Sequence, residues 1–209
     1  SPSQSNADPK NVPVPLAYRV TQLAVVVLLL TWSVLDWRQL QHWRASETLF
    51  RYGLAQNERS MTMLNNMTAT LRNTGRYEEA LDFARRGVEA WPDRVKPYIN
   101  LGVALQDVGD VDAAVSVLEH GIDVDPESLE ARRTLAQALM RKQRIAAAAQ
   151  QYEEMLRIDP QNALALLGLA KIAMEGGDWP TAQQMYAELA KSPPRGVDLQ
   201  VTFADLAMN

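Results

Sequence analysis

The chain has 209 residues, of which 47% are hydrophobic and 22% charged, with a formal net charge of -4 and no cysteine. This balance is typical of a folded chain and not of a disordered one. The mild acidity argues against a nucleic-acid-binding protein, which would carry a basic excess. The lack of cysteine excludes disulfides, cysteine nucleophiles and thiolate metal sites.

The first 35 residues predict a tail and a membrane span. Residues 1–15 hold four prolines among small polar residues, which is typical of an extended arm. Residues 16–35 include sixteen consecutive uncharged residues, close to the roughly 17–25 apolar residues of a spanning helix. Tyr18 and Trp32 lie where interfacial aromatic residues are found, so we expect one transmembrane helix in contact with membrane lipid. A buried helix of a soluble protein and a helix lying in the membrane interface are the alternatives.

The connector at residues 36–60 has helical periodicity and no proline. Trp37, Leu40 and Trp43 share one helical face, and a second apolar stripe that includes Phe50 follows. We therefore expect a stiff helical link after the span.

Alanine and proline recur every 34 residues in the rest of the chain, always twelve residues apart. A period of this length predicts stacked helical hairpins, so we expect an all-α solenoid. Apolar residues at positions seven and eleven of each cycle give the first helix a buried face, and the proline ends the second helix. Counted from Met61, the cycles are 61–94, 95–128, 129–162 and 163–196, and the repeated residues are Ala80, Ala114, Ala148, Ala182, Pro92, Pro126, Pro160 and Pro194.

Position fifteen of each cycle marks the turn between its two helices. Gly75, Gly109 and Gly177 hold this position, because glycine accepts the left-handed backbone that ends a helix. The third cycle has Gln143 instead, which predicts a slightly different turn there.

The same period extends beyond the four cycles. Carried backwards, it places Phe50 and Gly53 at positions that recur in the later cycles, which predicts the second helix of a half repeat at residues 45–57. Carried forwards, it predicts a capping helix at residues 197–209, which would shield the last apolar face of a solenoid.

The whole pattern over residues 61–196 resembles the tetratricopeptide repeat family. The resemblance implies a right-handed α-solenoid whose first helices line a concave groove for protein partners. Arg132 departs from the family, which has an aromatic residue at position four, so we expect the third cycle to be locally unusual. The groove positions that we select as the partner-binding site are Asn65, Arg72, Ile99, Val103, Gln106, Arg133, Gln137, Met140, Arg141, Leu167, Lys171 and Met174.

A second resemblance covers residues 20–90. The stretch WRQLQHWRASETLFRYGLAQN, with LNNM and NTGRYEEAL after it, is similar to the junction between the last membrane helix and the repeats of polytopic, glycosyltransferase-like membrane proteins of the O-mannosyltransferase type. The resemblance implies repeats that face away from the cytoplasm, whereas the basic residues around the span lean weakly to the opposite topology. We follow the resemblance and expect a single-pass protein of the bacterial inner membrane with extracytoplasmic repeats.

No group of residues predicts catalysis, a cofactor or a metal site. His42 has no acidic neighbour at helical spacing and His120 has no second histidine, and no phosphate loop or nucleophile motif appears. We therefore expect a membrane-anchored scaffold for protein–protein interaction, an accessory or assembly subunit that binds partners through the groove and the span. The alternative is a component of an envelope-polysaccharide or protein-glycosylation machinery that recruits or regulates a glycosyltransferase. An enzyme acting alone is the third interpretation.

Overall fold

The computed structural model describes residues 25–33 and 46–191, and the chain divides into two compact units, residues 1–46 and 47–209. In the first unit, residues 25–33 are helical. Their apolar side chains are exposed, with Leu28 at 68% and Trp32 at 70%.

The predicted membrane span is only partly within the described residues. Of the expected span at residues 16–35, residues 25–33 are described. Within the described ranges, no helix combines the length and the apolar character that crossing a membrane requires. The predicted tail at residues 1–15 and the predicted cap at residues 197–209 lie outside the described residues.

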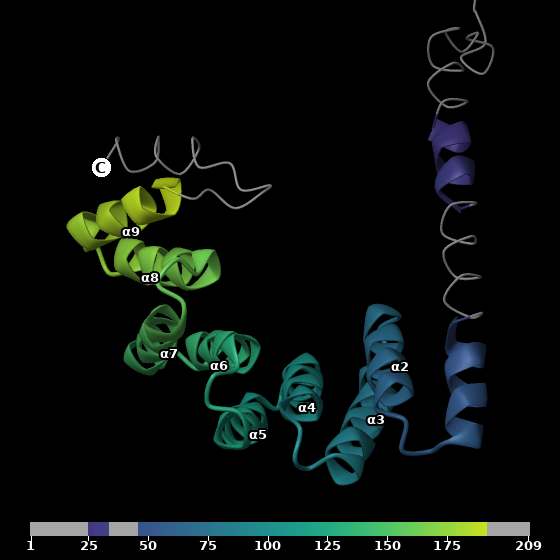
Figure 1. Cartoon of the computed structure of the whole chain (residues 1–209). Helices are drawn as coiled ribbons and strands as arrows, with labels where there is room; N and C mark the ends of the chain where they lie inside the picture. Colours follow the sequence, from purple (N-terminus) through teal and green to yellow (C-terminus); the bar gives the residue numbers. More distant parts are fainter. Residues whose placement is uncertain (1–24, 34–45, 192–209) are drawn as a thin grey trace, which may run out of the picture. The chain divides into compact units, whose positions relative to one another are not determined.

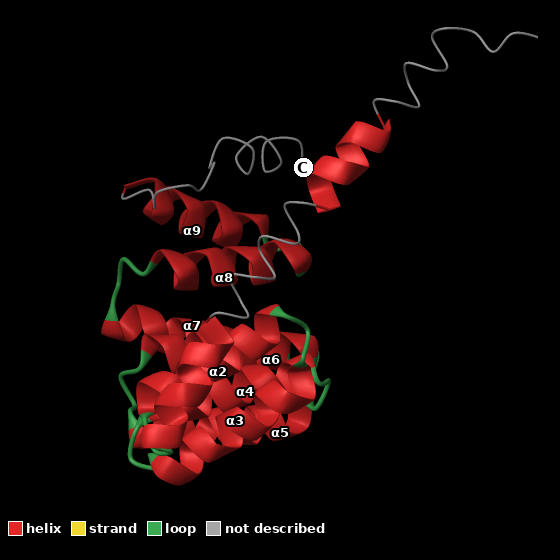
Figure 2. Cartoon of the chain, turned by 90° about the vertical axis from the view of Figure 1, so that its right-hand side faces the viewer, coloured by secondary structure: helices red, strands yellow, loops and turns green. Residues whose placement is uncertain are grey.

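The second unit is a succession of helix pairs. The helix at residues 46–56 comes first, and four pairs follow in chain order among the described residues (Figure 1). Three residues join the helices of each pair and four residues join one pair to the next. Figure 2 shows helices and loops alone in the described parts. The helices are α2 (Met61–Asn73), α3 (Tyr77–Ala90), α4 (Val95–Asp107), α5 (Val111–Val124), α6 (Leu129–Arg141), α7 (Ile145–Ile158), α8 (Ala163–Glu175) and α9 (Trp179–Lys191).

The 34-residue period of the sequence is also the period of the core. The four alanines of the second helices are completely buried, because a small residue lets the helices of a pair approach closely. Gly102 does the same on α4, since a Cβ at this position would come within 2.5 Å of Leu118 Cγ. Large apolar residues fill the space between these contacts, among them Met67 and Leu118, both fully buried. Each such side chain contributes about 1.5–3 kcal/mol by burial. The alanines are Ala80, Ala114, Ala148 and Ala182.

The turns inside the four pairs share one backbone conformation. The three glycines at position fifteen have φ of +75°, +89° and +75°, and Gln143 has φ of +57°. The Gln143 N–H donates to the Met140 carbonyl at 3.0 Å and the Arg144 N–H to the Leu139 carbonyl at 2.9 Å, as the equivalent residues do in the other three turns. The prediction of a different third turn is therefore wrong, because the hydrogen bonds of the helix end hold even a residue with a side chain in the left-handed region.

Arg132 replaces the aromatic residue of position four without losing its hydrogen bond. In the second pair, the Tyr98 hydroxyl donates to the Pro92 carbonyl at 3.0 Å. In the third pair, the Arg132 guanidinium donates to the equivalent carbonyl of Pro126 at 2.8 and 3.1 Å. It also donates to Gln151 Oε1 at 3.0 Å. In the third pair the donor is therefore a guanidinium and not a hydroxyl, but the acceptor is still the carbonyl of the equivalent proline.

The helix at residues 46–56 packs on the first pair. Phe50 lies against the buried cluster of Met67, Leu71 and Ala80. At one end of this contact, Glu47 accepts hydrogen bonds from Arg51 at 2.9 Å and from Arg76 at 2.7 Å. These contacts join the helix to the pair that follows.

The first helices of neighbouring pairs lie side by side at the start of the stack. α2 contacts α4 and α4 contacts α6, whereas the second helices α3, α5 and α7 have no comparable contact with one another. The first helices therefore line the inner side of this part of the stack. α6 and α8 depart from the pattern, because they have no contact of comparable extent.

Candidate functional site

The twelve residues selected from the sequence all lie on the four first helices. Ten of them are exposed or half-buried and offer surface to a partner. Ile99 and Gln106 are 3% and 9% exposed, so their side chains offer little surface to a ligand. The inner face, meaning the surface formed by α2, α4, α6 and α8, is therefore a mixture of amide, apolar and basic side chains. By helix, the residues are Asn65 and Arg72 on α2, Ile99, Val103 and Gln106 on α4, Arg133, Gln137, Met140 and Arg141 on α6, and Leu167, Lys171 and Met174 on α8.

Polar contacts between neighbouring first helices occupy part of the inner face. On α2, Arg72 pairs with Asp107 of α4, and Asn65 accepts a hydrogen bond of 2.7 Å from Asn100. These side chains hold α2 beside α4, so Arg72 is not a free cation for a ligand.

The next two helices are joined in the same way. Lys96 of α4 pairs with Glu130 of α6 at 2.7 Å, and Arg141 of α6 donates to the Gln106 carbonyl at 3.0 Å. Lys96 and Glu130 occupy position two of their cycles, a groove position, although they are not among the twelve selected residues. Opposite charges one period apart are the signal in the sequence that would have predicted their pairing.

Two arginines of α6 have no carboxylate partner within the described part of the chain. Arg133 donates to the neutral Gln137 at 3.3 Å, and Arg141 donates to the backbone carbonyl of Gln106. Neither of these acceptors offsets the positive charge of the guanidinium group. The inner face is therefore electrically balanced between α2 and α4 and basic at α6.

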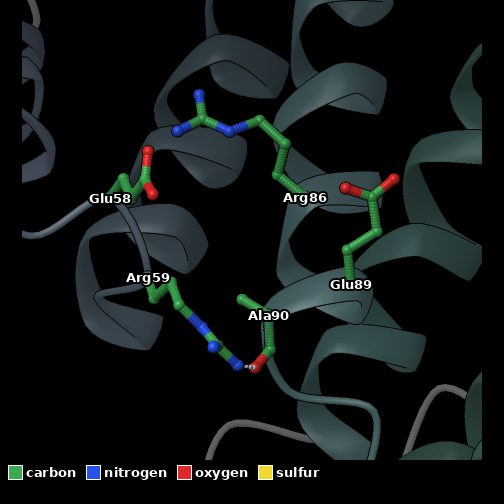
Figure 3. Close-up of a pocket in the computed structure, with 5 residues that line it drawn as sticks. All are labelled: Glu58, Arg59, Arg86, Glu89 and Ala90. Atoms are coloured by element: carbon green, nitrogen blue, oxygen red, sulfur yellow. Dashed lines mark hydrogen bonds between the residues drawn. The ribbon is translucent and has the colours of Figure 1, made fainter.

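A hollow of about 270 Å³ lies between the loop that precedes α2 and the end of α3. Two arginines and two glutamates line it with Ala90, so it has no net charge (Figure 3). Arg59 donates to the Ala90 carbonyl at 2.7 Å, and the Trp91 indole N–H donates to the Arg59 carbonyl at 2.7 Å. These reciprocal bonds fix the loop to the helix end, and we interpret this hollow as structural.

Metal ligation and catalysis find no support in the described residues. No group of three or more histidine, cysteine or acidic side chains there has a geometry that would hold a metal ion. His120 is exposed and lies 3.8 Å from Asp123. His42 lies outside the described residues.

Comparisons with known proteins agree with the helical-repeat geometry. Three profiles described as Tetratricopeptide repeat match residues 60–91, 99–163 and 139–199. Protein O-mannosyl-transferase Tmtc3 of Drosophila melanogaster is 33% identical over 84 residues, a match that covers 40% of this chain. The match covers 9% of that protein, so this chain corresponds to a small part of it.

Solved structures of other repeat proteins share the fold. TTC0263, a thermophilic TPR protein in Thermus thermophilus, has a TM-score of 0.65 and 21% identity over 84% of this chain and 95% of its own. MamA 41-end from Desulfovibrio magneticus RS-1 has a TM-score of 0.62 and 16% identity, over 77% and 92% of the two chains. YrrB, described as a TPR protein with an unusual peptide-binding site, has a TM-score of 0.59 and 15% identity, over 80% and 86%. At these identities the likeness shows the fold alone.

Proposed function

Because this chain belongs to the tetratricopeptide repeat family over residues 60–91 and 99–199, we propose that it is a protein–protein interaction scaffold whose partner binds the inner face. The observation that carries the proposal is the exposure of that face. Val103, Gln137 and Lys171 present surface that neither the core nor the turns require. Grooves of this mixed composition suit an extended peptide or a partner helix. The proposal gives the chain no catalytic role.

A charged substitution on the inner face tests the scaffold proposal. Val103→Glu places a carboxylate in the middle of the groove on a half-buried position. A partner that co-purifies with the full chain and is lost from the folded variant supports the proposal. A partner that the variant retains at full yield binds elsewhere and contradicts it.

The scaffold is further proposed to be anchored in a membrane by residues 16–35. The support is the helical stretch at residues 25–33, whose valines and leucines are between 51% and 68% exposed. So much contiguous apolar surface is unfavourable in water, and lipid would cover it. From the resemblance of residues 20–90 to the junction of O-mannosyltransferase-type membrane proteins, we further propose that the repeats lie on the extracytoplasmic side of a bacterial inner membrane.

Membrane fractionation tests the anchor separately from the scaffold. Wild-type chain is expected to stay in the membrane pellet after a carbonate wash. The double variant Val26→Asp, Leu29→Arg is expected to move to the supernatant, because each charge costs about 2.5–3.5 kcal/mol at the centre of a span. Leu49→Arg, at an exposed position of the helix at residues 46–56, is the matched control and should stay in the pellet. If the wild-type chain is found in the supernatant, the anchor proposal is wrong and the scaffold proposal is unaffected.

The second candidate is a role beside a glycosyltransferase, within a membrane complex of which this chain would be an accessory subunit. The observation that favours it is the 33% identity with a protein O-mannosyl-transferase, over a match that covers 40% of this chain. Purification from the native membrane in mild detergent separates the two candidates. A glycosyltransferase that co-purifies in fixed ratio supports this role, and other partners in its place support a scaffold of a different complex.

A further inference from the structure

The helix at residues 46–56 carries an exposed stripe without charge. Leu49 and Tyr52 are 59% and 66% exposed, and the exposed Ala55 follows one turn further along the same face. The other face of the helix holds Phe50, which packs on the first pair, and the buried Leu54. We call Leu49, Tyr52 and Ala55 the open stripe.

The 34-residue period shows that this stripe is unusual for its place. In all four complete pairs, the positions of Tyr52 and Ala55 hold ionisable residues, for example Arg86 and Glu89 on α3 and Glu154 and Arg157 on α7. The end of a repeat array needs a polar outer face if water is to cover it. The helix at residues 46–56 has an aromatic residue and an alanine there instead, so we expect another molecule to cover the open stripe.

The residues that correspond to Leu49 show what covers this place in a complete pair. Met185 packs on a cluster that contains Leu166 of α8, and Gln151 accepts a hydrogen bond of 3.0 Å from Arg132 of α6. The other two pack on clusters that contain residues of α2 and α4. In each pair the cover therefore includes the first helix of the same pair. All four equivalents are half-buried: Phe83, Val117, Gln151 and Met185.

The described part of the second unit begins with the helix at residues 46–56, so within it no first helix of the same cycle covers Leu49. We infer that an amphipathic helix of a partner protein binds the open stripe, in the place that a first helix takes in the complete pairs. The partner helix presents an uncharged apolar stripe with helical spacing, because a charge buried against Leu49 and Tyr52 would meet no opposite charge on the stripe.

Two observations favour this occupant. The charged residues of the same helix, Glu47 and Arg51, already pair with each other, and Glu47 also pairs with Arg76 of the first pair, so they do not call for a charged ligand. A second copy of the same helix is a poorer cover, because the second helices α3, α5 and α7 have no comparable contact with one another within the chain. The open stripe is not part of the inner face, so this contact is additional to the one proposed for the scaffold.

Photo-crosslinking of the full chain in its native membrane tests the inference. Benzoylphenylalanine in place of Tyr52 keeps an aromatic ring on the stripe and bonds covalently to the group that lies against it. Mass spectrometry is expected to locate the bond in another protein, on a segment whose apolar residues have helical spacing. Leu49→Arg should lower the yield of this product at least about tenfold, since it places a charge in an apolar contact. The same photoreactive residue in place of Arg86, at the equivalent position of α3, should give no such product.

The control substitution is Val124→Arg, which adds the same charge at an exposed apolar position of α5 and should leave the yield unchanged. Circular dichroism establishes that each variant is folded. Val103→Glu should also leave the yield unchanged, so failure of the groove proposal and failure of this inference can be told apart. A bond to this same chain, to a second copy or to lipid would overturn the inference. So would the absence of any product, or a yield that Leu49→Arg does not lower.

Discussion

The third turn gives the sharpest test of how the repeats are held, through the substitution Gln143→Gly. Gln143 adopts φ of +57° in a turn whose hydrogen bonds match those of the glycine turns. A residue with a Cβ costs roughly 1–2 kcal/mol in the left-handed region. Glycine removes this cost. Its greater conformational freedom in the unfolded chain, however, destabilises the folded protein by about 0.4–1 kcal/mol. The expected net effect is a stabilisation of about 0.5–1 kcal/mol.

Urea unfolding followed by circular dichroism measures this effect as a shift of the midpoint. The reverse substitution, Gly109→Ala, is the matched control. No atom lies within 4 Å of its added Cβ, so it introduces backbone strain without a clash and should lower the midpoint by a similar amount. Gln143→Ala keeps the Cβ and should be close to neutral. A midpoint that falls in Gln143→Gly, or that rises equally in Gln143→Ala, would refute the reasoning, because the left-handed backbone would then not be the cause.

Three further substitutions test the packing, the position-four contact and the ion pairs. Gly102→Ala should destabilise by about 1–3 kcal/mol in urea, because its Cβ would meet the buried Leu118, whereas Gly87→Ala, with its nearest neighbour at 3.7 Å, should be neutral or stabilising by up to about 1 kcal/mol. Arg132→Ala should cost about 1–3 kcal/mol by calorimetry, and Arg132→Tyr should restore most of it if the bond to the carbonyl of the preceding loop is what matters. Burial acts to raise the pKa of Glu47, but hydrogen bonds from Arg51 and Arg76 lower it by a larger amount, so the pKa of this carboxyl lies below its usual 4.5. A lowered carboxyl pKa adds stability above the unfolded pKa and loses it as the pH falls through the folded pKa, so Glu47→Gln should destabilise by less than about 1 kcal/mol at pH 7 and by progressively less at lower pH.

The helical-repeat fold follows from the sequence because two residue types repeat together. An alanine that lets two helices cross and a proline that ends the second helix recur with one period, and this period is that of stacked helical hairpins. The turn at Gln143 is a feature that the sequence pattern does not predict correctly. Residue type alone predicts a different turn, but the hydrogen bonds of the helix end outweigh a cost of roughly 1–2 kcal/mol and keep the turn unchanged.

The same limit applies to the inner face. The period places the selected residues on the first helices, but it does not tell a free side chain from a paired one. Arg72 and Arg133 look alike in the sequence, and only the structure shows that Arg72 is paired with Asp107 while Arg133 has a neutral partner. Charge pairing between repeats is a property of two residues about one period apart, so it has to be sought along the period and not within one cycle.

The packing of Tyr152 also depends on a residue one helix away. In the sequence it is one more apolar residue at position twenty-four, beside Ala84 and Leu118. Its size has a consequence only because residue 168, on the next helix, is glycine and admits the ring. The ring then packs α7 against α8, and the first helices α6 and α8 lack the close contact seen earlier in the stack. A change of one side chain in a regular array therefore takes effect only together with the residue that it meets on the next helix, and a search for such changes has to compare both positions.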